Sequence, residues 1–169
     1  MSLIGFLDLV RTRRSVRRYK SDPVPREKLE YVLEAARLAP SWGNRQCWRF
    51  IVVTDEAKRR AITTREWAAE APVVIVGCAH PHLSGSKFSQ QYYMLDMGIA
   101  MEHLILAAAE QGLGTCWIGG QFDEEAVKQA LGIPEGARVV ALTPIGYPAE
   151  TPGPKGRKAT EEIVSHNRW

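Results

Sequence analysis

The sequence lacks most features that mark a membrane, secreted or metal-binding protein. No apolar run approaches the roughly 18 residues that a membrane-spanning helix needs. Residues 1–14 place their apolar stretch before their positive charges, which is the reverse of a secretory signal. The three cysteines, Cys47, Cys78 and Cys116, cannot all pair with one another, and none stands at metal-ligand spacing from another. We therefore expect a cytoplasmic protein with reduced thiols, no membrane segment and no metal site.

Catalytic signatures are also missing. The chain contains no GxSxG, CxxC, HExxH or Walker pattern, and no GxGxxG follows a strand. Gly112-Leu-Gly114 stands where a helix ends, and His80 and His82 have no third ligand at a sensible spacing. No side chain is therefore predicted to be catalytic, and an enzyme of this kind would take its chemistry from an organic cofactor.

The composition is that of an ordinary globular domain, and its positive charge is local. With 169 residues, 45% of them hydrophobic and 24% charged, residues 1–169 are expected to form a single domain. The net charge is +3, yet residues 11–20, RTRRSVRRYK, hold six of the 22 lysines and arginines and no acidic residue. Such a small patch suits a small anion better than a phosphate backbone, so a nucleic-acid-binding module is only a remote alternative.

Alternating strand and helix patterns predict a three-layer sandwich of the α/β or the α+β class. Asp55 and Asp123 stand at helix N-caps, and Gly112 and Gly132 at helix ends. The chain from Pro148 is rich in proline and is expected to form an extended C-terminal arm, residues 148–169. The strands are predicted at residues 49–54, 73–78, 115–118 and 138–145, and the main helices at residues 26–39, 89–111 and 124–131.

Four segments carry residue types that a simple turn or linker does not need. Arginines cluster around a serine at residues 13–17, as in phosphate recognition by guanidinium groups and a hydroxyl. Residues 39–50 follow a helix end with polar amides and two tryptophans. Glycines end a strand at residues 117–120, where the backbone can approach a flat ligand. Lys155 and Arg157 add two cations within the arm.

In this order the four segments resemble the FMN-dependent nitroreductase family over nearly the whole chain. The run RRSVR at residues 13–17 resembles the family's opening R-[RH]-S-x-[RK] motif, and PSWGNRQCWRF at residues 40–50 resembles its P-S-x-x-N-x-Q-P-W-x-F motif. LGTCWIGG at residues 113–120 is similar to the strand-end segment beneath the flavin, and PKGR at residues 154–157 to the late K-x-R. Each motif alone is weak, whereas the ordered set is specific.

The strand candidates predict a central sheet of four or five strands. The resemblance implies an α+β fold, a three-layer α/β/α sandwich whose central sheet is mixed and mainly antiparallel, and a homodimer with FMN sites at the subunit interface. In this view Arg13 and Ser15 contact the FMN phosphate and ribityl chain, and Arg17 lies near the pyrimidine edge of the ring. We assign the methionine face of the helix at residues 89–111, with Met94, Met97 and Met101, to the dimer interface. The whole implied cofactor site comprises Arg13, Arg14, Ser15, Arg17, Gln46, Ile118, Gly119, Gly120, Lys155 and Arg157, with Pro40, Ser41 and Asn44 from the second subunit.

The implied activity is that of a flavin-dependent oxidoreductase. FMN would accept hydride from NADH or NADPH and pass electrons to a nitroaromatic or quinone acceptor by a ping-pong mechanism. Cys47 replaces the family's proline, and Trp42 is bulky where small polar residues are common, so both bear on the choice of substrate. Reductive dehalogenation, flavin fragmentation, or flavin binding without turnover remain alternatives, and neither the physiological acceptor nor the preferred nicotinamide cofactor follows from the sequence.

Overall fold

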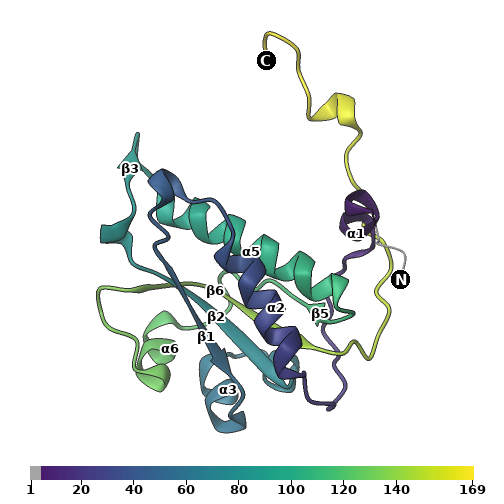
Figure 1. Cartoon of the computed structure of the whole chain (residues 1–169), viewed down its shortest axis with the longest axis vertical. Helices are drawn as coiled ribbons and strands as arrows, with labels where there is room; N and C mark the ends of the chain where they lie inside the picture. The colour runs from purple at the N-terminus through teal and green to yellow at the C-terminus, as the bar shows by residue number, and fades with distance from the viewer. Residues whose placement is uncertain (1–4) are drawn as a thin grey trace.

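A four-stranded antiparallel sheet forms the centre of the molecule (Figure 1). The structure is a computed structural model that describes residues 5–169. Each strand runs antiparallel to its neighbours in the order β1-β2-β6-β5. One parallel bridge, between Ser15 and Thr115, extends the sheet beyond β5. The bounds are β1 Trp48–Val53, β2 Val73–Ala79, β5 Gly114–Thr115 and β6 Arg138–Gly146.

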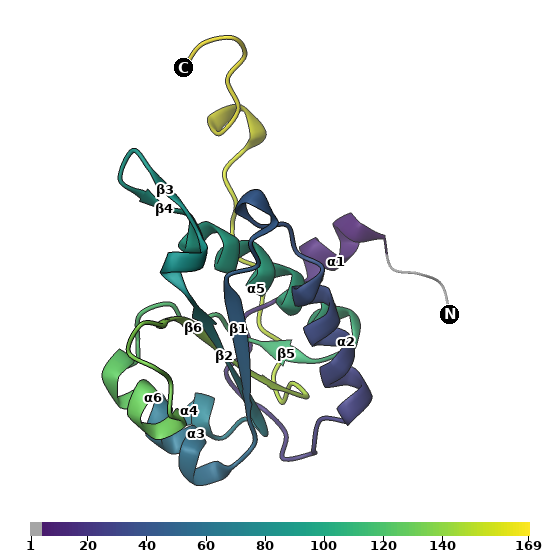
Figure 2. The same ribbon diagram turned by 60° about the vertical axis from the view of Figure 1, so that its left-hand side comes forward.

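Helices cover both faces of this sheet and complete three layers, as Figure 2 shows. On one face lie α2 (Arg26–Arg37) and α5 (Tyr92–Glu110), which pack against each other. On the other face lie α3 (Glu56–Ile62), α4 (Glu66–Ala69) and α6 (Glu124–Leu131). The α+β sandwich expected from the sequence is confirmed, with four strands in its central sheet.

Alternation of side chains along β2 divides the interior into two cores. Val73 and Ile75 point toward α2 and α5 and belong to the first core, whereas Val74 and Val76 belong to the second core beneath α3, α4 and α6. Every residue of β2 is buried, because both faces of the strand are covered by helices. Its sequence therefore does not alternate between apolar and polar residues.

The helix ends form where their capping residues predict. The side chain of Asp55 accepts a hydrogen bond from Lys58 N at 2.8 Å and begins α3. Asp123 does the same for α6, accepting from Ala126 N at 3.0 Å. Gly132 ends α6 in the left-handed region at φ 66°.

The long helix α5 differs from its predicted form in two ways. It begins at Tyr92, three residues after the predicted start, because residues 86–91 form a hairpin of β3 (Ser86–Lys87) and β4 (Gln90–Gln91). Its methionines also do not share one exposed face. Met97 and Met101 are fully buried in the first core, where a Cβ on Gly77 would lie 2.8 Å from Met97 Sδ, so the interface stripe assigned from sequence was wrong for these two residues.

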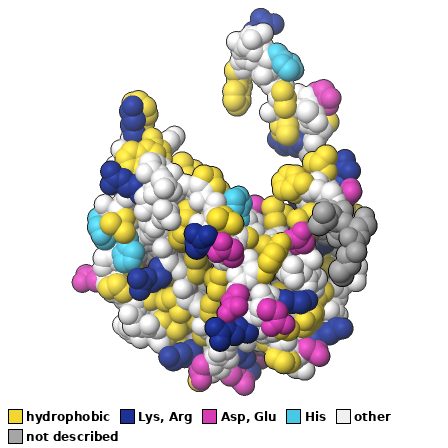
Figure 3. Space-filling model, viewed as in Figure 1, with side chains coloured by type: hydrophobic (Ala, Val, Ile, Leu, Met, Phe, Trp, Pro, Cys, Tyr) yellow, Lys and Arg dark blue, Asp and Glu magenta, His cyan; other side chains and the backbone are white. Residues whose placement is uncertain are grey.

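The C-terminal arm begins by following the N-terminal segment. Tyr19 forms an antiparallel bridge with Pro148, and Ala149 N donates to Arg18 O at 2.8 Å. The arm then passes α1 (Phe6–Thr12) and extends away from the body, with only a short turn at η3 (Thr160–Glu162) (Figures 1 and 3). Its first half therefore lies next to the clustered arginines, and its second half is exposed. No helix within residues 5–169 has the length and apolar character needed to cross a membrane.

Candidate functional site

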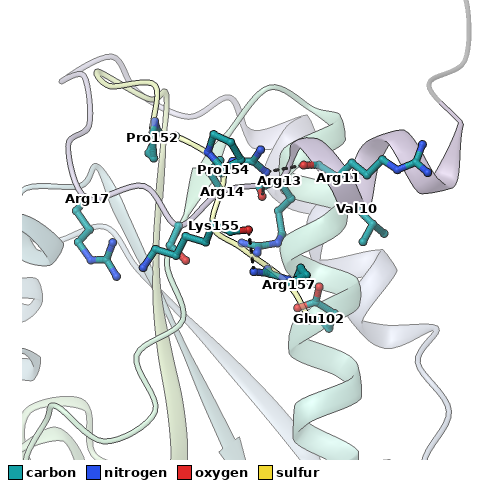
Figure 4. A pocket seen from close by; sticks show the side chains of 12 residues that line it. Val10, Arg11, Arg13, Arg14, Arg17, Glu102, Pro152, Pro154, Lys155 and Arg157 are labelled. Carbon is teal, nitrogen blue, oxygen red and sulfur yellow. Dashed lines mark hydrogen bonds between the residues drawn. The ribbon is translucent and has the colours of Figure 1, made fainter. Parts of the chain in front are cut away.

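A cavity of about 480 Å³ opens where α1, α5 and the arm meet (Figure 4). The segment after α1 forms one wall, Glu102 of α5 forms another, and the arm crosses in front. The lining residues are Val10, Arg11, Arg13, Arg14, Ser15, Arg17, Glu102, Pro152, Gly153, Pro154, Lys155 and Arg157.

Backbone contacts hold the arginine segment and the arm in place. Val16 N donates to Thr115 O at 2.8 Å, and the absence of a Cβ on Gly114 permits this approach, since that atom would lie 2.9 Å from Val16 Cβ. Tyr19 Oη donates to Val16 O at 2.5 Å, and burial raises the pKa of this phenol, which keeps the donor protonated. Arg17 N donates to Glu150 Oε1 at 2.6 Å, which joins the segment to the arm.

The cavity is strongly cationic and few of its charges are compensated. Six of its side chains are basic, and only Glu102 is acidic. Among residues 5–169, Arg11 alone of the six forms an ion pair, with Asp8 at 3.4 Å. Arg14 Nη1 donates to Arg13 O at 2.9 Å, and Arg157 Nη1 to Gly156 O at 3.0 Å, so these guanidinium groups are held by backbone carbonyls. This combination favours binding of a multiply charged anion.

Glu102 is the exception in the cationic wall. Partial burial raises the pKa of its carboxyl group, and the nearby charges of Arg13 and His103 oppose that rise. Its carboxyl group is thus easier to protonate than that of an ordinary surface glutamate. In the neutral form, Glu102 does not repel an anion bound in the cavity.

A second cavity of about 380 Å³ shares Arg17 with the first. Trp67 of α4 and the loop after β5 line it, the full set being Arg17, Trp67, Cys116, Trp117, Ile118, Gly119, Gly120 and Gln121. No atom lies within 4 Å of a Cβ built on Gly120, so its backbone is open to the cavity. Gly119 has a different reason to be glycine, because a Cβ there would lie 2.7 Å from Trp117 Nε1.

Cys116 lies in the wall of the second cavity as a buried thiol. Burial raises its pKa, and the charge of Arg17 and a hydrogen bond with Ser15 only partly oppose that effect. A thiol whose pKa is raised is a poor nucleophile at neutral pH. Neither cavity therefore offers an activated nucleophile, and within the described residues no cluster of three or more metal-ligating side chains accompanies them.

The loop with Pro40, Ser41, Asn44 and Gln46 lines neither cavity. It folds on itself, since Gln46 N donates to Ser41 Oγ at 2.9 Å and Gln46 Nε2 to Asn44 Oδ1 at 3.3 Å. Asn44 and Gln46 adopt positive φ values of 54° and 48°, which are costly for residues with a side chain. The loop is therefore held in a strained and specific shape at a distance from its own chain's cavities.

Asp96 holds this loop and was missed by sequence reasoning. It is buried in α5 and accepts hydrogen bonds from Trp42 N at 2.8 Å, Ser84 Oγ at 3.1 Å and Cys47 Sγ at 3.5 Å. Trp67 was missed as well. A lone aspartate within an apolar helical run was an available signal for the first, whereas nothing local distinguishes Trp67.

Of the thirteen site residues predicted from the sequence, nine line one of the two cavities that share Arg17, and four lie on the separate loop. The nine are Arg13, Arg14, Ser15, Arg17, Ile118, Gly119, Gly120, Lys155 and Arg157. They come from three regions far apart in the sequence. The fold and these cavities define an α+β protein with a cationic pocket and a second, partly aromatic pocket, which share Arg17 in their walls.

Comparison with known proteins identifies the family. The family model described as Nitroreductase family matches residues 10–69 and 63–147, and the chain belongs to this family. A candidate NADH dehydrogenase/NAD(P)H nitroreductase of Archaeoglobus fulgidus is 38% identical over 151 residues, which cover 85% of this chain and 86% of that protein.

Two solved structures extend the comparison to the fold. A nitroreductase family protein from Clostridium novyi NT is 37% identical, with a TM-score of 0.81 and coverage of 87% of each chain. An FMN-dependent nitroreductase from Clostridium difficile R20291 is 28% identical, with a TM-score of 0.86, and the alignment covers 97% of this chain and 100% of that chain.

Proposed function

We propose that this chain is an FMN-dependent oxidoreductase that oxidises NADH or NADPH. One observation carries the proposal: Arg17 lines both cavities. The first is cationic with few compensated charges, and the second has open backbone at Gly120. The first suits the phosphate of FMN and the second its flat ring. The names of the relatives, an NAD(P)H nitroreductase and an FMN-dependent nitroreductase, support the same cofactors.

At the phosphate end, the residues fit a phosphate monoester. Arg13, Lys155 and Arg157 provide cations from two sides, Ser15 provides a hydroxyl, and Arg14 lies beside them. Because none of the four cations makes an ion pair within residues 5–169, binding of the phosphate would not have to break one.

At the ring end, Arg17 would supply a fixed positive charge beside the pyrimidine edge, and the backbone from Ile118 to Gly120 would face the ring. Bound FMN would supply the redox chemistry, accepting hydride from NAD(P)H and passing electrons to an acceptor. The role of Arg17 is to stabilise the negative charge that develops at this edge on reduction. No protein side chain needs to act as nucleophile or proton donor.

The loop with Pro40, Ser41, Asn44 and Gln46 would complete the site of a second copy. It lines neither cavity of its own chain, yet Asp96 and its internal hydrogen bonds keep it in a defined shape. We therefore propose a homodimer in which the loop of each copy contacts the FMN of the other copy. The arm, residues 148–169, belongs to the same single domain as the rest of the chain. The chain's three buried, unpaired cysteines suit the reducing cytoplasm.

A single flavin site shared by donor and acceptor in turn would produce ping-pong kinetics. Initial rates of NADH or NADPH oxidation against a quinone or a nitroaromatic should give parallel double-reciprocal lines. A halogenated phenol belongs in the same screen, since dehalogenation is the main alternative reaction.

The decisive test of the proposal is cofactor binding by the purified protein. It should be yellow, release FMN on denaturation, and have that flavin bleached by NADH or NADPH without air. A protein that takes up no FMN at micromolar concentration would overturn the proposal, and intersecting kinetic lines would overturn the ping-pong order alone.

A further inference from the structure

Trp67 lies against the guanidinium group of Arg17, with Arg17 Cζ 5.7 Å from the ring centroid. Its position in α4 brings it to the second cavity from a different part of the chain than either Arg17 or the glycine loop. We propose that Trp67 is a positioning residue that fixes the guanidinium of Arg17 and thereby sets how strongly the site prefers reduced over oxidised FMN. This inference rests on the proposed function.

The indole ring of Trp67 is held in place by its packing against the second core. It is partly buried and packs against the second core, while Ala68 and Ala69 beside it are buried and hold α4 close to the sheet. Arg65 Nε also donates to Gln121 Oε1 at 2.9 Å, which joins the start of α4 to the loop that contains Gly119 and Gly120. The segment that carries Trp67 is therefore tied both to the second core and to the cavity wall.

Arg17 has no other partner of this kind within residues 5–169. Its backbone N–H is bound to Glu150, but its guanidinium forms neither a side-chain hydrogen bond nor an ion pair there. A long arginine side chain samples many rotamers unless something selects one. The face of Trp67 is the contact that selects a rotamer in this structure.

The geometry leaves the donors of Arg17 available. A guanidinium stacked on an aromatic ring uses its flat face and keeps its N–H groups free at its edge. Arg17 could thus rest on Trp67 and donate to a flavin oxygen at the same time. Arg17 is exposed in this structure, and a flavin ring bound over the second cavity would exclude water from the pair. Cation–π attraction strengthens from about 0.5–1 kcal/mol when exposed to about 2 kcal/mol when desolvated.

The first experiment is a double-mutant cycle read by redox potentiometry of the FMN-loaded protein. Trp67→Leu, which keeps the apolar contact with the second core but has no π face, should lower the ratio of affinities for reduced and oxidised FMN by roughly two- to thirtyfold, making the potential more negative. Trp67→Phe retains a ring and should recover most of the effect. In an Arg17→Gln background, Trp67→Leu should change the potential little.

The cycle separates this inference from the proposed function. Equal shifts from Trp67→Leu with and without Arg17, or an unchanged potential in the FMN-loaded Trp67→Leu protein, would overturn the inference and leave the oxidoreductase standing. Failure of the unmodified protein to bind FMN would overturn both.

A second measurement needs no cofactor and distinguishes positioning from a change in folding. In the flavin-free protein, the Arg17 Nε–Hε NMR signal should show an upfield ring-current shift from Trp67. We expect that shift to survive in Trp67→Phe and to vanish in Trp67→Leu, with the remaining amide signals in place. An Arg17 signal without a ring-current shift in the unmodified protein would also overturn the inference.

Discussion

Single residues decide the charge of the first cavity. Arg13 and Arg157 reach it from opposite ends of the chain, and neither forms an ion pair within residues 5–169. Glu102 stands in the same wall with a raised pKa. Anion affinity should therefore depend on a few individual cations and on the protonation of one carboxyl group.

Removal of either cation should weaken FMN binding. A charged hydrogen-bond partner contributes about 1.5–3 kcal/mol, so Arg13→Ala and Arg157→Ala should each raise the Kd for FMN roughly ten- to a hundredfold. Flavin fluorescence titration measures this directly. Arg26→Ala removes the same charge from the exposed start of α2 and serves as the matched control. Unchanged affinity in both cavity variants would show that the phosphate binds elsewhere.

Glu102→Gln should strengthen FMN binding as the pH rises. Below its raised pKa, Glu102 is neutral and equivalent to glutamine; above it, a negative charge opposes the phosphate. Two like charges 4 Å apart in water repel by about 1 kcal/mol, which corresponds to about fivefold in Kd at low salt.

The measurement is the ratio of the two Kd values, unmodified over Glu102→Gln, from pH 5 to pH 8. This ratio cancels the titration of the phosphate itself, which both proteins share. It should rise with pH. A flat ratio would show that the charge of Glu102 does not affect binding, and a falling ratio would mean that Glu102 assists binding by orienting Arg13.

At the scale of elements, Asp96 joins three parts of the fold. It lies in α5 and accepts hydrogen bonds from the loop before β1 and from the connection after β2. The positive φ of Gln46, which its residue type does not favour, shows that hydrogen bonds constrain the loop's shape, both within the loop and to Asp96. Asp96 is the clearest source of that constraint.

Asp96→Ala should destabilise the protein and loosen the loop. It leaves the Trp42 N–H and the Ser84 hydroxyl without their acceptor, which costs about 1–3 kcal/mol in the free energy of unfolding. Urea denaturation measures the loss, and limited proteolysis should cut within residues 40–46. Asp96→Asn keeps one carbonyl oxygen and should lose less. Asp22→Ala, at an exposed aspartate, should stay within about 0.5 kcal/mol.

At the scale of the whole molecule, the outer surfaces of α1 and α5 are unusually apolar. Phe6 and Leu7 are 69% and 62% exposed, and Leu95 of α5 is 55% exposed. Groups of exposed apolar side chains on a folded protein are typical of an interface. A second copy covering α5 would also account for a loop that lines neither cavity of its own chain.

If the proposed homodimer forms across α5, Leu95→Glu should shift it toward monomer and weaken the proposed FMN binding together with it. Burying an unpaired carboxylate at an interface is costly, because its charge loses hydration. Light scattering coupled to gel filtration gives the mass, and flavin titration the affinity. Gln129→Glu adds the same charge to exposed α6 on the opposite face of the sheet and should change neither. A monomeric unmodified protein that binds FMN at full strength would contradict the shared site.

Short-range patterns predicted the elements well where one local cause dominates. Asp55 and Asp123 cap their helices because a carboxylate satisfies nearby backbone N–H groups whatever surrounds it. The start of α5 was misplaced because Phe88 and Ser89 adopt positive φ in the hairpin turn, a conformation that their residue types do not signal. Met97 and Met101 were assigned to the wrong face because helical spacing gives a stripe without showing which side meets the sheet.

The sequence by itself determined the apolar strands, the capped helices and the cluster of arginines, since each depends on neighbours within a few positions. Only the tertiary structure decided which distant groups converge: Lys155 and Arg157 join Arg13 because the arm pairs with Tyr19 and Arg18, and Trp67 meets Arg17 because α4 packs on the second core. Asp96 likewise became the anchor of the 40–46 loop through a contact across the fold. These contacts between distant residues depend on long-range packing, which no short sequence period encodes.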